Sequence, residues 1–71
     1  MKDRGFKINW IQAQVKKFFE RNPEETISIN KIVSAFAIEL ASTKKTGDEI
    51  IKQLAEIGFL KIEGDNIVSV S

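Results

Sequence analysis

Apolar residues in the first half of the chain recur at helical spacing and outline two helices. The first follows a short N-terminal arm and is expected to end near Asn22, because Pro23 disfavours helical geometry in the residue before it. Its apolar positions are Trp10, Ile11, Val15, Phe18 and Phe19. The second helix keeps one apolar face throughout, at Ile29, Ile32, Val33, Phe36, Ala37 and Leu40.

The start of the second helix carries signals of its own. Ser28 can act as its N-cap, and Ile27 before it can pack on Ile32 inside the helix as a hydrophobic staple. Residues 27–29 are expected to form a short extended segment that leads into this helix.

A third helix is expected to end at Gly58, which can adopt the left-handed C′ conformation. Its apolar stripe comprises Ile50, Ile51, Leu54 and Ile57. Its start is open between two positions, because Thr46 opens a capping-box sequence whereas Thr43 would cap a helix that begins at Lys44. Gly47 costs a helix about 1 kcal/mol relative to alanine, so it either marks the helix start or permits the close approach of another helix.

Residues 59–70 switch to the alternation of a β-hairpin. Their apolar positions share one face only if the loop between the strands has an odd number of residues, since cross-strand partners point the same way. Those positions are Leu60, Ile62, Val68 and Val70. Residues 64–66 are therefore expected to form a three-residue loop with Asn66 in its left-handed position.

This order of elements resembles that of winged helix-turn-helix proteins. Residues 41–46 resemble the turn and the opening of the recognition helix, and residues 54–60 resemble the leucine, glycine and apolar pair that lead into the wing. Three positions depart from the family pattern: Ala41 stands where glycine is common, Ser42 where an apolar residue is common, and Gly47 where a branched apolar residue usually packs. The resemblance covers residues 8–70 and implies an α+β, mostly α fold of three helices with a C-terminal β-hairpin wing.

Composition limits the classes of function. The 71 residues suffice for one small core, and we expect a basic arm over residues 1–7 and a single domain over residues 8–71. Cysteine and histidine are both absent, which removes thiolate and imidazole ligands, the corresponding nucleophiles and the usual general base. A non-enzymatic protein without metal, cofactor or small-molecule ligand is therefore expected. No segment has the composition of a signal peptide or a membrane span, so we expect a cytoplasmic protein with no membrane partner.

The net charge of +1 is unevenly distributed. Residues 1–45 hold nine basic and five acidic residues, a net charge of +4, whereas residues 46–71 hold two basic and five acidic residues, a net charge of −3. In the winged-helix family the opening of the third helix enters the DNA major groove. The resemblance therefore implies DNA contacts from Lys31, Lys44, Lys45, Thr46 and Lys52. The alternative is a solvated turn that does not bind DNA. Acidic residues of the same helix and of the wing favour this alternative, because they would repel the phosphates: Asp48, Glu49, Glu56, Glu63 and Asp65.

A second candidate surface lies along the first helix. Helical steps place Trp10, Gln14, Lys17 and Arg21 along one edge of its apolar face. An aromatic side chain flanked by bases can act as a protein-binding hot spot or stack on a nucleotide; alternatively, Trp10 closes the edge of the core.

Two hypotheses of function follow. In the first, a winged-helix module acts in DNA transactions through its third helix. In the second, an accessory subunit binds a larger nucleic-acid machine, such as a polymerase, or a second copy of itself. Ile38, which lies opposite the core stripe of the second helix, is a candidate contact for such a partner, together with Trp10, Lys17 and Arg21.

Overall fold

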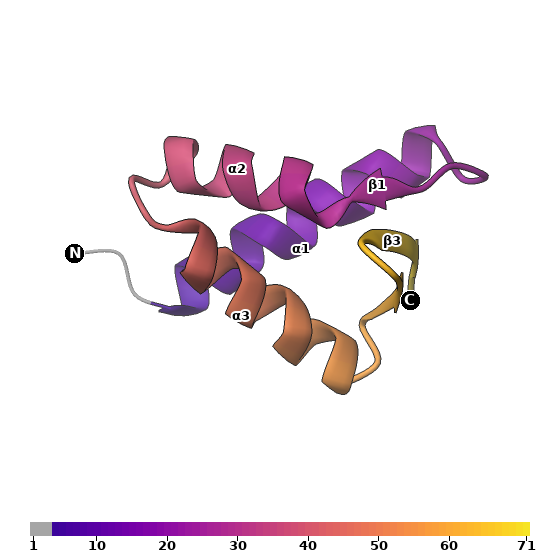
Figure 1. The fold of residues 1–71 in the computed structure, drawn as a ribbon. Coiled ribbons are helices and arrows are strands. Elements are labelled where there is room, and N and C mark those ends of the chain that lie inside the picture. The colour runs from indigo at the N-terminus through magenta and orange to yellow at the C-terminus, as the bar shows by residue number, and fades with distance from the viewer. Residues whose placement is uncertain (1–3) are drawn as a thin grey trace.

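The computed structural model describes residues 4–71, which form three helices and three strands. In chain order these are α1 (Arg4–Arg21), β1 (Ile27–Ser28), α2 (Ile29–Glu39), α3 (Lys44–Glu56), β2 (Leu60–Glu63) and β3 (Asn66–Val70). The fold is α+β and mostly helical, as predicted. Figure 1 shows α2 and α3 diverging from the turn that joins them, with the strands near the end where the two helices lie furthest apart. Within residues 4–71, no helix combines the length and apolar character needed to cross a membrane.

Helix α1 begins earlier than the sequence pattern indicates. Residues 4–7 of the expected arm form its first helical residues, and residues 1–3 lie outside the described part of the chain. The end of α1 agrees with the prediction, since the backbone amide of Asn22 donates to the carbonyl of Phe18 at 2.8 Å and Pro23 follows.

The start of α3 is decided by Thr43. Its hydroxyl oxygen accepts a hydrogen bond from the amide of Thr46 at 3.1 Å, so α3 begins at Lys44 and not at a cap on Thr46. Ser28 occupies the N-cap position of α2 with extended geometry, but its side chain makes no capping hydrogen bond, contrary to expectation. The amide of Ile29 instead donates to the carbonyl of Asp65 at 2.9 Å, which joins the start of α2 to the hairpin turn.

Gly47 lies inside α3 and faces α2. A Cβ atom at this position would lie 3.0 Å from Cδ2 of Phe36 and 3.1 Å from Cβ and Cγ1 of Val33. Of the two roles predicted for this glycine, the structure therefore supports the close approach of another helix.

Two helices end with a residue in the left-handed region. After α3, Gly58 has φ 85°, which confirms the predicted left-handed C′ residue, and the amide of Phe59 donates to the carbonyl of Leu54 at 2.9 Å, which closes a Schellman motif. After α2, Ala41 has φ 51°, and the amide of Ser42 donates to the carbonyl of Ala37 at 3.0 Å. An alanine thus occupies the position for which glycine is the favoured residue.

The strands form one antiparallel sheet in the order β1-β3-β2. The predicted three-residue hairpin loop is wrong, because β2 ends at Glu63 and β3 begins at Asn66, which leaves the two-residue turn 64–65. Gly64, not Asn66, has the positive φ, at 61°. A glycine at the first central position is typical of a type II′ turn.

A register shift places apolar residues of the two strands opposite each other although the turn has an even number of residues. Leu60 pairs with Val70, but Ile62 pairs with Ile67, so the extra residue of a β-bulge falls between these two pairs. Ile67 is fully buried as a result, whereas Val68, expected on the core face, is only half-buried.

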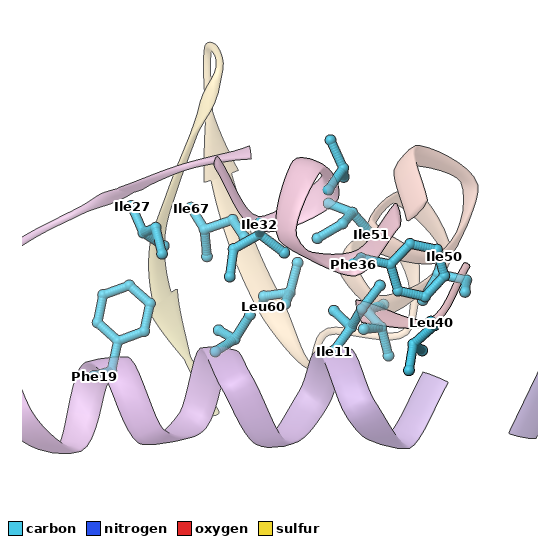
Figure 2. Packing of buried hydrophobic residues seen from close by; sticks show 13 residues of the cluster. Ile11, Phe19, Ile27, Ile32, Phe36, Leu40, Ile50, Ile51, Leu60 and Ile67 are labelled. Carbon is cyan, nitrogen blue, oxygen red and sulfur yellow. The ribbon is translucent and has the colours of Figure 1, made fainter. Parts of the chain in front are cut away.

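The core lies between α1 and the other elements, as Figure 2 shows. Its buried side chains come from all three helices and all three strands: Ile11, Val15, Phe19, Ile27, Ile32, Val33, Phe36, Leu40, Ile50, Ile51, Leu54, Leu60 and Ile67. Ile57 is the exception to the predicted stripe of α3, because it is the C-cap residue and is 74% exposed.

Candidate functional site

The opening of α3 combines a helix N-terminus with two lysines. Because Thr43 is the cap, Lys44 and Lys45 are the first two residues of the helix, and both are exposed. The first turn holds no acidic residue. Amides at the start of a helix have no partner within it and carry partial positive charge, so this end favours an anion.

Thr46 has a structural role in this opening. It is half-buried, its amide donates to Thr43, and its hydroxyl oxygen lies 3.1 Å from that of Thr43 in a second hydrogen bond. The structure therefore places Thr46 next to the two predicted lysine contacts but engages it in the cap.

A groove runs from this opening to the hairpin turn. Its volume is about 610 Å³, and its apolar lining includes Val33, Ile51 and Ile62. Its charged lining residues are Lys44, Asp48, Lys52 and Asp65. Two lysines and two carboxylates line the groove, so its charges balance, whereas the first turn of α3 holds lysines and no acidic residue.

Lys31 and Lys45 lie outside the lining of this groove. Lys31 is exposed next to Asn30, which lines the groove from the first turn of α2. The structure thus brings Lys44 and Lys52 onto one groove and leaves Lys31 and Lys45 exposed outside its lining.

Sequence reasoning missed the role of Arg4. Its guanidinium Nη2 donates to Oε1 of Gln53 at 3.3 Å and lies 3.9 Å from Oε1 of Glu49. Arg4 therefore connects the start of α1 to α3 and partly neutralises an acidic residue of α3. No pattern in the sequence predicts this contact, since it depends on how α1 packs against α3.

The α1 surface is partly structural and partly open. Trp10 is half-buried, with its ring centroid 6.0 Å from that of Phe36 and a tilt of 58°, so it covers the edge of the core. Further along the helix, Lys17 and Arg21 line a cavity of about 230 Å³. The apolar lining of that cavity is Phe18, Ile27 and Ile32.

Two isoleucines stand apart from these surfaces. Ile38 is 79% exposed, as predicted, but it lies on a different side of α2 from Ile32 and is not brought together with Lys17 and Arg21. Ile57 was missed as a surface residue and lies at a cavity of about 310 Å³ that Ile8 also lines. Its position before a helix-ending glycine is the signal that could have indicated exposure.

The described residues contain no group of acidic side chains that could hold a metal ion. Every charged side chain within residues 4–71 is exposed or half-buried, so none sits in the buried environment that usually tunes acid–base catalysts.

Comparison with known proteins adds no relative. The chain matches no known family, no curated protein and no solved structure.

Proposed function

We propose that this chain is a winged helix-turn-helix domain that binds DNA with the opening of α3. Its element order of helix, short strand, two helices and a C-terminal hairpin is the order that the winged-helix resemblance implies. The short turn between α2 and α3, closed by the left-handed Ala41, supports the helix-turn-helix interpretation.

The observation that carries the DNA-binding proposal is the position of two lysines. Lys44 and Lys45 occupy the first two positions of α3, where a positive charge is unfavourable beside the positive end of the helix dipole. A phosphate bound there would relieve this repulsion and accept hydrogen bonds from the helix amides. The exposure of both residues leaves that approach open.

The remaining contacts follow from this orientation. With the start of α3 in the major groove, Lys31 in the first turn of α2 and Lys52 further along α3 supply flanking phosphate contacts. Asp48 lies between Lys44 and Lys52 on one edge of α3 and can accept a hydrogen bond from cytosine N4. Asp48 thus gives the groove one side chain that suits a base edge.

Fluorescence anisotropy with labelled duplex and single-stranded DNA tests the proposal. Binding to the duplex at low salt should weaken steeply as salt rises, with the slope of log affinity against log salt near −0.9 for each phosphate contact. Lys45→Glu should abolish detectable binding and leave the circular dichroism spectrum unchanged. Lys16→Glu is the matched control, because Lys16 is an exposed lysine of α1 that lines a cavity with Pro23 and Val70, without residues of α3, and the substitution makes the same change of charge.

Equal loss of binding in both variants would show that only the overall charge matters. Unchanged binding by Lys45→Glu would refute the site. Absence of duplex binding by the wild-type protein at low salt would refute the function.

A second candidate function is that of an accessory subunit of a larger assembly. The observation in its favour is Ile38, whose side chain is 79% exposed on the outer side of α2. Affinity capture from cell extract with the wild-type protein and with Ile38→Asp tests it. A protein recovered only by the wild type would support this role, and identical recoveries would remove Ile38 from consideration.

A further inference from the structure

A small apolar cavity with a basic rim lies between α1, β1 and α2. Its apolar lining is Phe18, Ile27 and Ile32, and its cations are Lys17 and Arg21. None of these residues belongs to the opening of α3 or to the groove that runs from it. The cavity is therefore independent of the proposed DNA-binding surface.

The two cations on the rim have no acidic partner within residues 4–71. Both are exposed, they stand one turn apart on α1, and the described ion pair of α1 belongs to Arg4. No acidic residue lines the cavity. Glu20, the acidic residue of α1, lines a different cavity together with Pro23. The rim thus carries a local excess of positive charge.

The rim continues along α1 toward its N-terminal end. Helical steps of three and four residues lead from Arg21 and Lys17 through Gln14 to Trp10 and Phe6. Phe6 is 48% exposed and Trp10 is half-buried. This α1 stripe, defined by these five residues, spans about 22 Å at 1.5 Å per residue. One half is aromatic and the other half is basic.

We propose that the α1 stripe and its cavity bind a helical segment of a partner protein that presents apolar side chains and carboxylates on one face. Carboxylates one turn apart on such a helix can reach both Lys17 and Arg21. An apolar side chain between them fills the cavity, which is the anchor of a helix-in-groove interface.

The size and lining of the cavity favour this occupant over others. A volume of about 230 Å³ lies below the roughly 300–1,000 Å³ typical of small-molecule pockets, so the cavity suits single side chains of a larger partner. Phe18, Ile27 and Ile32 line the cavity beside Lys17 and Arg21, so a partner that supplies both apolar side chains and carboxylates contacts more of this surface than a phosphate backbone does.

The test uses the full chain and three labelled amphipathic peptides. One peptide carries leucines along one face with glutamates beside them, the second replaces each glutamate with lysine, and the third is a scrambled sequence with the composition of the first. Anisotropy measures affinity, and amide chemical shifts of the isotope-labelled protein locate the contact. Duplex DNA is titrated under the same conditions.

The wild-type protein should bind the glutamate peptide at least about tenfold more tightly than the other two, with shifts concentrated around the cavity. The double variant Lys17→Glu with Arg21→Glu should reverse the preference between the glutamate and lysine peptides. Lys16→Glu, which alters an exposed lysine outside the cavity lining, and Lys45→Glu, which alters the DNA surface, should each retain the wild-type preference.

Several outcomes would overturn the proposal. These are absence of binding, equal affinity for the scrambled peptide, a double variant that keeps the wild-type preference, and shifts that map to α3. Duplex DNA that shifts the cavity amides would identify a nucleic acid as the occupant instead. Because Lys45→Glu separates the two surfaces, loss of DNA binding and loss of peptide binding remain distinguishable.

Discussion

Replacing Gly47 with alanine tests whether helix spacing or helix propensity controls this position. A Cβ atom there would meet Phe36 and Val33 at 3.0–3.1 Å. Carbon atoms pack best at about 3.5–4.0 Å, so the neighbours would have to move by several tenths of an ångström. Phe36 is 0% exposed and Val33 is 2% exposed, which leaves both side chains without open space to move into.

Two effects of opposite sign determine the free energy of unfolding of Gly47→Ala. Alanine in a helix is more favourable than glycine by about 1 kcal/mol. Overpacking of a well-packed core costs about 1–3 kcal/mol. We expect crowding to dominate because both contacting side chains are buried, which gives a net destabilisation of about 1 kcal/mol. For a domain of this size, that change lowers Tm by about 4–8 °C.

Urea denaturation and thermal unfolding, both followed by circular dichroism, measure the difference. Gly5→Ala is the matched control, because Gly5 is an exposed residue of α1. It is the same glycine-to-alanine change in a helix, but the added methyl group is not buried. The control should be neutral or stabilising by up to about 1 kcal/mol. If Gly47→Ala proved as stabilising as this control, the two helices would separate at little cost and the steric argument would be wrong.

Four further substitutions test the helix ends and the core edge. Ala41→Gly should stabilise the fold by about 0.5–1 kcal/mol, because it relieves a left-handed alanine, although glycine also gains entropy in the unfolded chain. Thr43→Ala should destabilise it by about 1 kcal/mol through loss of the cap on α3, whereas Ser28→Ala should have a smaller effect because the Ser28 side chain makes no capping bond. Trp10→Ala should cost about 1–3 kcal/mol, since its half-buried ring packs on Phe36.

The same denaturation experiments measure all four. Gly58→Ala provides the reverse of the first substitution and should destabilise the fold, because Gly58 also has a positive φ. A neutral Ala41→Gly would show that the left-handed strain at residue 41 is small. Equal losses from Thr43→Ala and Ser28→Ala would contradict the difference in capping, and an unchanged stability for Trp10→Ala would indicate that its ring contributes no packing energy.

The helices were predictable because each repeats its apolar positions over several turns. The uninterrupted stripe of α2 and the stop signals at Pro23 and Gly58 all agree with the structure. The predicted loop length of the hairpin was wrong because the alternation of apolar residues cannot reveal a β-bulge. A bulge reverses which residues of a strand face the core without changing the composition. Ile57 was assigned to the core because it continues the apolar spacing of α3, although its place directly before the helix-ending Gly58 could have indicated exposure.

The candidate surfaces were only partly predictable. Lys44 and Lys45 were singled out through the resemblance to winged-helix proteins, and the choice between Thr43 and Thr46 as the cap needed the local geometry. The stripe from Trp10 to Arg21 was visible as a helical edge, but the cavity beside it is completed by residues of β1 and α2.

By itself, the sequence determined the number of helices, the apolar face of each, the boundaries marked by proline and glycine, and the absence of thiol and imidazole chemistry. These features depend on residues close together in the chain or on composition alone. The tertiary structure decided which surfaces meet: that Gly47 admits α2, that Arg4 reaches Glu49, that Ile27 pairs with Ile67 and that a cavity opens beside Lys17. Each of these contacts joins distant segments, and its geometry depends on how whole elements pack around one core.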